Sequence, residues 1–454
     1  MSRLASYLGW SGIVRLGLVQ TSLGAIIVLT TSTLNRVMVV ELALPAMLPG
    51  FLVAVHHLVQ LSRPRFGYGS DVGGRSTPWI IGGMVILALG GVGAALATTL
   101  MESMPTLGIS LALLAFISIG LGAGASGTSL LVLLAKRVPA QRKAAAATIV
   151  WIMMIAGFAV TAGLAGHFLD PFSPQRLVAV TAVVSACAVM VTLIAVYRLE
   201  GSGQACTAEV AAMTTGPMPG FLPALREVWQ EPEARRFTVF VFISMLAYSA
   251  QDLILEPFAG TVFGMTPGES TQLAGIQHGG VLLGMLIVAV SGSVARLGGV
   301  GTLRVWAVGA CLASALALFG IAFGGAASAD WPLRANVFAL GVSNGAFAIA
   351  AIASMMTLSS SGRAGREGLR MGLWGAAQAI AFGLGGFLGT VAVDVARHLL
   401  AEPNLAYGLV FSGEAALFVV AALLAARINP PQPALRQPAP AFGDIAVAQV
   451  LGGR

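Results

Sequence analysis

Two acidic residues, Asp252 and Glu256, follow an apolar run in the stretch SAQDLILEPFAG at positions 249–260. Because they are four residues apart, they share one face of a helix, and the next residue, Pro257, favours a break or kink there. An Asp deep in a membrane span costs about 2.5 to 3.5 kcal/mol, so such a residue generally has a partner or a function. The alternative is that both acids lie in water at the membrane surface.

A basic partner for these acids occurs in the stretch TLNRVMVVEL, which closes the first apolar run of the chain. This stretch is expected at the same end of the protein as the two acids. We therefore predict that Arg36 pairs with Asp252 or Glu256 and closes the two halves of the chain over a central cavity. The predicted gate consists of six residues: Asn35, Arg36, Glu41, Gln251, Asp252 and Glu256.

Three histidines, His56, His57 and His278, lie within or near apolar runs. Their spacing gives no H-x-x-x-H or carboxylate pattern for zinc or iron, so no protein-built metal centre is predicted. One imidazole nitrogen is enough for an axial ligand to the magnesium of a chlorin, and the sequence leaves that role open for each of the three. The alternative for each is a histidine that is hydrogen-bonded within the helix bundle.

The composition places all of these residues in a membrane protein. The chain has 454 residues, of which 57% are hydrophobic and only 9% are charged. Apolar runs of about 20 residues recur throughout, each long enough to cross the hydrocarbon core as a helix. We predict an all-α polytopic fold with twelve transmembrane helices in two pseudo-symmetric six-helix bundles. The predicted spans are 13–34, 42–62, 77–99, 106–135, 144–168, 176–198, 237–256, 271–295, 303–325, 333–358, 368–394 and 405–427.

The distribution of Lys and Arg predicts the orientation. With these spans, most basic residues fall on one side of the membrane, which the positive-inside rule makes cytoplasmic together with both termini. Only four fall on the other side: Arg36, Arg176, Arg334 and Arg397. The N-terminus has no pattern of a cleaved signal peptide, so we expect the first helix to be retained. Basic loops facing anionic lipid explain the net charge of +7 without nucleic acid.

The two halves of the chain repeat each other. GYGSDVGGR at 67–75 follows the second predicted span, and GSVARLGGV at 292–300 follows the eighth. Gly120 and Gly124 likewise match Gly341 and Gly345, and Arg142 matches Arg366. Three matches in the same order argue for a duplication of six helices. The predicted domains are an N-terminal bundle at 1–198, a cytoplasmic linker at 199–236, a C-terminal bundle at 237–428 and a disordered cytoplasmic tail at 429–454.

The first repeated stretch resembles the loop signature of the major facilitator superfamily, G-x-x-x-D-[RK]-x-G-[RK]-[RK], in the position which that family gives it. Its matching residues are Gly67, Asp71, Gly74 and Arg75. Glycines permit a tight turn, and an Asp and an Arg can pair across helix ends. The chain departs from the signature at Val72 and Ser76, where the family has basic residues.

Signatures of enzymes are missing from the sequence. There is no G-x-S-x-G, no Walker loop and no D-x-x-x-D pair that would hold a diphosphate through magnesium. The helices expected at the centre of the bundle carry few polar groups, chiefly Asn344 and Gln378, which suits an apolar ligand better than a sugar or an ion.

Several stretches, above all QDLILEPFAGTVFGMTPGESTQLAG at 251–275, resemble the PucC/LhaA family of phototrophic bacteria, a branch similar to the major facilitator superfamily. The resemblance covers nearly the whole chain. It implies a protein of the bacterial inner (intracytoplasmic) membrane that assembles light-harvesting complexes and handles bacteriochlorophyll as a bound ligand. It also implies membrane lipid, antenna polypeptides and bacteriochlorophyll synthase as partners, since some family members are called bacteriochlorophyll synthase chains.

Three functions therefore stay open at this point. The first is an assembly factor that holds bacteriochlorophyll, and it is the one that we expect. The second is a transporter of a small solute or a proton-coupled substrate, for which Asp252 and Glu256 would serve. The third, an enzyme, is not expected.

Overall fold

Apolar helices make up most of the described chain, and they confirm the all-α class. The computed structural model describes residues 8–62, 66, 75–139, 142–200, 226, 229–294, 300–327, 331–359, 367–400 and 402–428. Within these ranges, 11 helices are long and apolar enough to cross a membrane, and Met47–Ser62 is a shorter apolar helix. The chain is therefore a multi-pass membrane protein.

The helices correspond in order to the twelve predicted spans. Their bounds are α1 Trp10–Val28, η1 Leu29–Thr33, α2 Leu34–Arg36, η2 Val37–Glu41, α3 Met47–Val59, η3 Gln60–Ser62, α5 Thr77–Leu100, α6 Pro105–Arg137, α7 Lys143–Leu169, α8 Pro174–Val196, α11 Pro232–Phe263, α12 Pro267–Val294, α13 Val300–Ala327, α14 Leu333–Ser359, α15 Glu367–Leu399 and α16 Pro403–Ala426. The first four segments run on as one helix, in which η1 and η2 are π-helical.

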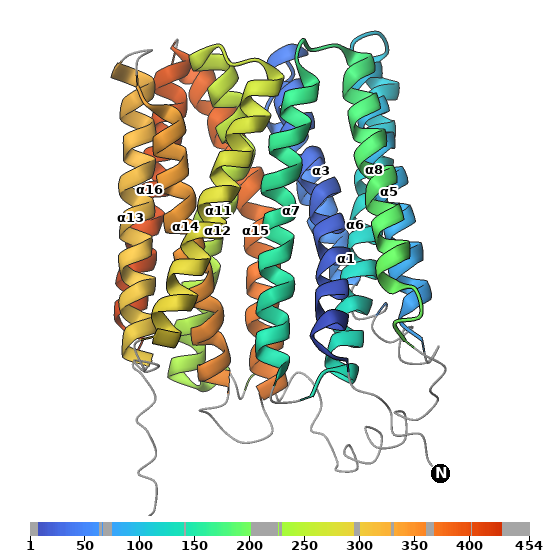
Figure 1. Ribbon diagram of the computed structural model, residues 1–454. Coiled ribbons are helices and arrows are strands. Elements are labelled where there is room, and N and C mark those ends of the chain that lie inside the picture. The colour runs from blue at the N-terminus through green and yellow to red at the C-terminus, as the bar shows by residue number, and fades with distance from the viewer. Residues whose placement is uncertain are drawn as a thin grey trace, which may run out of the picture.

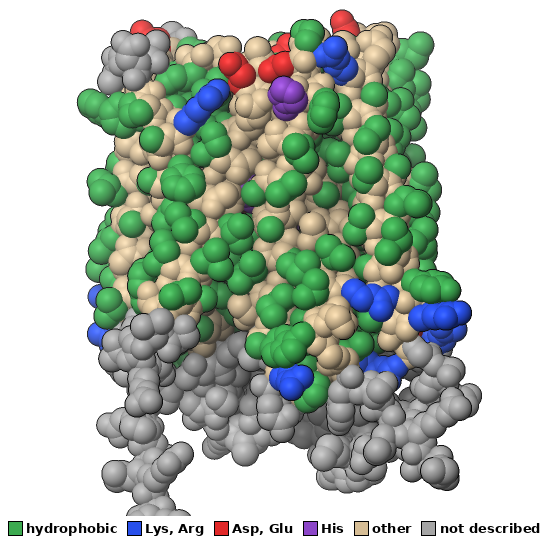
Figure 2. All heavy atoms as spheres, in the orientation of Figure 1, with side chains coloured by type: hydrophobic (Ala, Val, Ile, Leu, Met, Phe, Trp, Pro, Cys, Tyr) green, Lys and Arg blue, Asp and Glu red, His purple; other side chains and the backbone are tan. Residues whose placement is uncertain are grey.

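The helices alternate in direction, so the bundle has two ends (Figure 1). One end of the bundle contains η2 and the C-terminal ends of α7, α11 and α15, and it is uppermost in Figure 1. We call it the distal end. The opposite end, where α1 begins, is the proximal end. On the face drawn in Figure 2, most of the visible Lys and Arg side chains lie near the proximal end, and Asp and Glu lie near the distal end.

The two halves pack in the same pattern. In the first half α1 packs against α7 and α8, and α5 packs against α6 and α8. In the second half α11 packs against α15 and α16, and α13 packs against α14 and α16. Each pair in one half lies six transmembrane helices from its counterpart in the other. The packing thus follows the repeat of six helices that the sequence indicates.

Glycines bring equivalent helices close together in the two halves. A Cβ added at Gly120 of α6 would lie 2.6 Å from the backbone oxygen of His56 in α3. Gly341 and Gly345 of α14 similarly face backbone oxygens of α12. Small residues at such contacts let helix backbones approach in lipid, so these glycines serve packing.

The first two helices differ from their predicted bounds. The first continues to Glu41 rather than ending at residue 34, so Asn35 and Arg36 lie inside a helix. The second begins at Met47 rather than at residue 42. Two features between them oppose a helix: Ala43 adopts a positive φ of 50°, and Pro45 disfavours a helical conformation for the residue before it.

The seventh helix also differs from its prediction. We expected it to end at Glu256, before Pro257, but α11 continues to Phe263. It ends where Gly264, in the left-handed conformation, donates its N–H to the carbonyl of Ala259. Prolines are tolerated inside transmembrane helices when a neighbouring group satisfies the freed backbone carbonyl. Asp252 and Glu256 therefore lie within the helix and not at its end.

Candidate functional site

A donor from the first helix satisfies the carbonyl that Pro257 leaves free. In a regular α-helix the N–H of residue 257 would donate to the carbonyl of Leu253, but proline has no N–H. The amide nitrogen Nδ2 of Asn35 donates to this carbonyl at 2.5 Å. Asn35 is only 1% exposed, so this bond joins the two halves inside the protein.

Arg36 also joins the two halves, but without the ion pair that we predicted. Its Nη1 pairs with the carboxylate of Glu41, and its Nη2 donates to the backbone oxygen of Met265 at 2.6 Å. The guanidinium packs against Gly260 of α11, where an added Cβ would lie 2.9 Å from Nη2. A second carboxylate, that of Glu256, is within electrostatic range of Arg36. The prediction that Arg36 pairs directly with Asp252 or Glu256 is wrong.

The π-helical geometry of η2 explains this difference. Residues five apart come together in a π-helix, and Arg36 and Glu41 are five apart across η2. The guanidinium therefore finds a carboxylate on its own helix. Both carboxylate oxygens of Glu256, which is 2% exposed, have no hydrogen-bond partner among the described residues.

Gln251 and Asp252, the other two predicted gate residues on α11, do not contact Arg36. Asp252 is half-buried and its side chain lies next to Gln277 of α12. Gln251 is fully buried, and neither its amide nitrogen nor its amide oxygen has a partner among the described residues. The structure thus brings Asn35, Arg36 and Glu41 together with Glu256 and places Gln251 and Asp252 deeper in the C-terminal half.

Two further carboxylates, which the sequence analysis missed, hold the distal ends of the halves together. Asp394, near the end of α15, accepts hydrogen bonds from the backbone nitrogens of Ala46 at 3.0 Å and Met47 at 2.7 Å, where α3 begins. Asp170, directly after α7, accepts from Thr266 Oγ1 at 2.8 Å and from Gly268 N at 3.3 Å, where α12 begins. Carboxylates at helix N-termini are stabilising.

We call these two contacts the distal latches. They are equivalent in the two halves, because α7 and α15 are counterparts and so are α12 and α3. Contact between the halves continues towards the middle of the membrane through Ile155 of α7, which clusters with Val281 and Met285 of α12. The described residues thus join the halves from the distal end to about the middle of the bundle. In the sequence, each latch is only a single Asp near the end of a predicted span. Such residues are too common to indicate a contact between the halves.

Two of the three histidines, His57 and His278, pack against the opposite half of the chain. His56 is buried, and its Nε2 lies 2.8 Å from the amide nitrogen of Gln60. The ring of His57 packs against that of Phe382 in α15, with ring centres 5.9 Å apart. On the other side of the protein, His278 of α12 packs edge to face against Phe158 of α7, with ring centres 5.0 Å apart.

The hydrogen bond of His278 selects its tautomer. Its Nδ1 lies 2.8 Å from the carbonyl oxygen of Ala274, one turn earlier in the helix. A carbonyl only accepts, so Nδ1 carries the proton and Nε2 carries the lone pair. Metal-binding histidines generally donate their other N–H in this way. In this tautomer Nε2 of His278 can accept a hydrogen bond or bind a metal ion.

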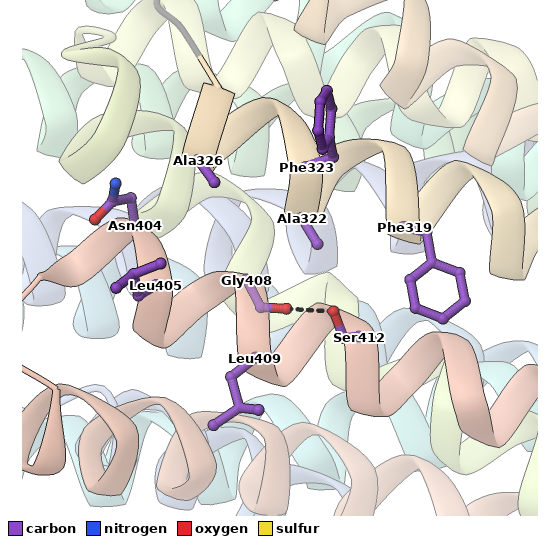
Figure 3. A pocket seen from close by; sticks show the side chains of 9 residues that line it. All are labelled: Phe319, Ala322, Phe323, Ala326, Asn404, Leu405, Gly408, Leu409 and Ser412. Atoms are coloured by element: carbon purple, nitrogen blue, oxygen red, sulfur yellow. Dashed lines mark hydrogen bonds between the residues drawn. The ribbon is translucent and has the colours of Figure 1, made fainter.

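A groove on the lipid-facing side of the C-terminal half, with a volume of about 330 Å³, lies away from these residues. It runs between α13 and α16, and Figure 3 shows Phe319 and Phe323 on one side and Leu405 and Leu409 on the other. The hydroxyl of Ser412 is bonded to the carbonyl of Gly408 in its own helix. The lining is mostly apolar, as expected for a surface in contact with lipid chains.

Most of the predicted loop motif lies outside the described residues. This applies to Gly67, Asp71 and Gly74, whereas Arg75 is described and exposed. Thr77, two residues after Arg75, begins α5. Its backbone N–H donates to the carboxylate of Glu200 at 3.0 Å, so Glu200 caps this helix.

One buried acid was missed by the sequence analysis. Glu414 in α16 is 4% exposed, and both of its carboxylate oxygens lack a partner among the described residues. The signal was available, because a single Glu inside the apolar run NLAYGLVFSGEAALFVVAALLAA is unusual for a membrane span.

The sequence is similar to several known proteins. A family model described as PUCC protein matches residues 33–432. The chain is 51% identical over 438 residues to the protein named Bacteriochlorophyll synthase 44.5 kDa chain of Rhodobacter capsulatus, covering 96% of this chain and 100% of that protein. It is 29% identical over 438 residues to Protein PucC of Rhodobacter capsulatus, covering 90% of each.

The fold is similar to that of solved transporters. A D-xylose-proton symporter has a TM-score of 0.68 at 15% identity, covering 93% of this chain and 98% of the symporter. The nucleoside transporter NupG has a TM-score of 0.64 at 12% identity, covering 92% of this chain and 98% of the transporter. These likenesses confirm the predicted major facilitator fold, and at such low identity they show the fold alone.

Proposed function

The chain belongs to the PUCC protein family, and on this premise we propose that it is an assembly factor for photosynthetic light-harvesting complexes that handles bacteriochlorophyll at the membrane. The name of the relative with 51% identity, a bacteriochlorophyll synthase chain, supports an association with this pigment. The likeness to Protein PucC supports the same role.

The observation that carries the pigment part of this proposal is the arrangement of His278. Bacteriochlorophyll contains a magnesium ion that takes one axial ligand from a protein, and a neutral imidazole can supply it. The proton on Nδ1 is held by the carbonyl of Ala274, which leaves the Nε2 lone pair for a metal. His56 is a weaker candidate because its Nε2 faces the amide nitrogen of Gln60.

The composition of the central helices supports an apolar cargo. Between residues 144 and 169 of α7 and between residues 335 and 359 of α14 the sequence contains no Asp, Glu, Lys or Arg. Such walls offer little to a sugar or an ion but suit a macrocycle with a hydrocarbon tail.

We propose that the protein assists pigment chemistry without performing it. The polar contacts described at the distal end are helix caps, one Arg–Glu pair and side-chain bonds to backbone carbonyls, which are structural arrangements. Antenna polypeptides and bacteriochlorophyll synthase are the proposed partners, together with membrane lipid.

The proposed location is the bacterial inner (intracytoplasmic) membrane, with both termini in the cytoplasm. The concentration of Lys and Arg at the proximal end, where the first helix begins, supports this orientation.

A transporter is the second candidate, and the fold favours it. The solved proteins of similar fold include a proton symporter, and the C-terminal half contains buried acids, Glu256 and Glu414, with no described hydrogen-bond partner. In this case a solute or proton would cross the membrane.

A deletion strain of the native host separates the candidates. The assembly role predicts loss of light-harvesting complexes while free bacteriochlorophyll is still made, and restoration by the intact chain. Accumulation of an unesterified pigment precursor would instead indicate an enzyme. Normal antenna complexes, together with proton-coupled uptake by the purified protein in liposomes, would overturn the assembly role in favour of transport.

A further inference from the structure

Two clusters of aromatic rings cross the interior of the C-terminal half at different depths. Towards the distal end, Phe258 of α11 packs against Tyr407 and Phe411 of α16, with ring centres 5.5 and 5.1 Å apart. Towards the proximal end, Phe347 of α14 packs against Phe240 of α11 and Phe418 of α16, at 6.1 and 6.2 Å. Helices α11 and α16 therefore meet both above and below one level of the bundle, and α14 joins them on the proximal side.

Polar residues occupy that level. Gln251 lies two helical turns before Phe258, Glu414 lies between Phe411 and Phe418, and Asn344 lies one turn before Phe347. Spacings of three, four and seven residues place side chains on one helix face, so these side chains point into the space between the two aromatic clusters. We call Gln251, Ser314, Asn344 and Glu414 the polar layer.

The depths of these residues agree. Gln251, Asn344 and Glu414 lie 12, 11 and 11 residues from the distal ends of α11, α14 and α16. At 1.5 Å per residue they are all about 17 to 18 Å from that end, near the middle of the membrane. Ser314 of α13 joins them, because its hydroxyl donates to Asn344 Oδ1 at 2.8 Å.

The polar layer is buried, and several of its hydrogen-bonding atoms have no partner among the described residues. Gln251, Ser314 and Asn344 have no exposed surface, and Glu414 is 4% exposed. Among the described residues no partner contacts either amide atom of Gln251, the amide nitrogen of Asn344 or either carboxylate oxygen of Glu414. Buried polar groups are almost always satisfied, so a small ligand must complete this arrangement.

The charge of the polar layer limits which kind of ligand could bind there. A carboxylate in the middle of a membrane needs a positive partner. Between the two aromatic clusters, α11, α13, α14 and α16 carry no Lys, Arg or His. Asp252, within electrostatic range of Glu414, is also an acid and so cannot neutralise it. Water alone would satisfy hydrogen bonds but would leave the charge uncompensated.

We propose that the polar layer binds one small monovalent cation at Glu414, either Na⁺ or a proton. Na⁺ would take its oxygen ligands from the carboxylate of Glu414, from Gln251 Oε1 and from the hydroxyl of Ser314. A proton would sit on the Glu414 carboxyl, which then donates to Gln251 Oε1 and accepts from Asn344 Nδ2. Both arrangements supply a partner for the Glu414 carboxyl and for Gln251 Oε1, and this cation site is independent of the pigment-handling role.

Other titratable groups near the layer are few, which makes Glu414 separable by experiment. The nearest such groups on the packed helices are Tyr248, Asp252 and Glu256 of α11, His278 of α12, Cys311 of α13, Asp394 and Arg397 of α15, and Tyr407 of α16. Glu256 is within electrostatic range of Arg36. His278 is turned towards α7, and Tyr407 is near Arg397 at the distal side. The described part of α14 has no titratable side chain between the aromatic clusters.

The test uses the purified full-length protein in detergent. Its thermal unfolding midpoint is measured while NaCl replaces choline chloride at constant ionic strength, and infrared spectra of the carboxyl C=O band are recorded over a pH series. The variants are Glu414→Gln, which keeps the shape of the side chain, and the matched control Glu402→Gln, which changes an exposed acid at the start of the same helix.

A Na⁺ site predicts that the midpoint of the wild type and of Glu402→Gln rises with NaCl, and that Glu414→Gln loses this rise. A proton site predicts no response to NaCl but a titrating carboxyl band in the wild type and Glu402→Gln that is missing in Glu414→Gln. If Glu414→Gln does not fold, the same spectra of the double variant Asp252→Asn, Glu256→Gln, which removes the other two acids of α11 near the layer, should still show a carboxyl band that titrates with pH or responds to Na⁺. Equal responses of the wild type and Glu414→Gln in both measurements, or a wild-type band insensitive to both, would overturn the proposal.

Discussion

Asn35 donates a hydrogen bond to the carbonyl of Leu253, the one carbonyl of α11 that Pro257 deprives of its helical donor. The proline and the asparagine lie in different halves of the chain, more than 200 residues apart. The irregularity in the seventh helix therefore creates a specific binding position for the first helix. Together with Arg36 and the distal latches, it holds the two halves together at the distal end.

Replacing Asn35 with Leu should destabilise the protein by about 1 to 3 kcal/mol, because the Leu253 carbonyl would then be buried without a donor. Unfolding in denaturant, followed by helix content, measures this change. Pro257→Ala supplies an N–H for the same carbonyl, so in that background Asn35→Leu should cost at least about 1 kcal/mol less. An equal loss in both backgrounds would show that the Asn35 bond does not compensate for the proline.

Arg36 should tolerate the loss of either nearby carboxylate but not of both. Glu41 pairs with the guanidinium, and Glu256 is within electrostatic range of it. Glu41→Gln and Glu256→Gln together would leave a guanidinium that is 2% exposed with no carboxylate, which is expected to cost about 3 to 5 kcal/mol. The free energy of unfolding of the double variant should therefore fall by at least about 1 kcal/mol more than the sum of the single changes.

The control for this pair combines Glu256→Gln with Glu102→Gln, which alters an exposed acid at the distal end of the same half as Glu41. These two changes should be additive. Additivity of Glu41→Gln and Glu256→Gln as well would rule out a shared role as counter-charges of Arg36.

The distal latches should set how often the halves separate at the distal end. A carboxylate at a helix N-terminus contributes about 1 kcal/mol, so Asp170→Ala and Asp394→Ala should each shift the balance towards the separated state about fivefold. Spin labels at Glu102→Cys and Glu402→Cys, one on each half and both exposed, would report the distance. The three native cysteines are first replaced.

Asp394→Asn serves as the matched control for this measurement, because it keeps one oxygen acceptor for the nitrogens of Ala46 and Met47. Its distance distribution should fall between those of the wild type and Asp394→Ala. Distributions that do not change in either alanine variant would mean that other contacts close the distal end.

Much of the fold could be predicted from the sequence, because a helix that crosses a membrane must be apolar over its length. The ends of the helices were harder to predict. Pro257 normally interrupts a helix, and only the position of Asn35 in the folded protein shows why α11 continues past it. In the same way, no sequence pattern indicated the π-helical turns that bring Glu41 to Arg36.

The candidate site was predicted in part for the same reason. Asn35, Arg36 and Glu256 lie near one another in the structure. Their grouping could be proposed from the sequence because charged residues are rare in the chain and the six-helix repeat relates their helices. The partner of Arg36 depends on local helix geometry, and the latches depend on which helix ends meet. Neither the local helix geometry nor the pairing of helix ends can be predicted from residue spacing along one segment.

Pigment binding by His278 is the most direct test of the proposed function. The protein is purified from its native host in mild detergent, and the bacteriochlorophyll absorption per molecule of protein is measured for the wild type, for His278→Leu and for His167→Leu, which alters an exposed histidine of α7. We expect a pigment band in the wild type and in His167→Leu, and at least about a tenfold weaker band in His278→Leu at equal protein abundance. The absence of any pigment band from the wild type, or an undiminished band in His278→Leu, would contradict it.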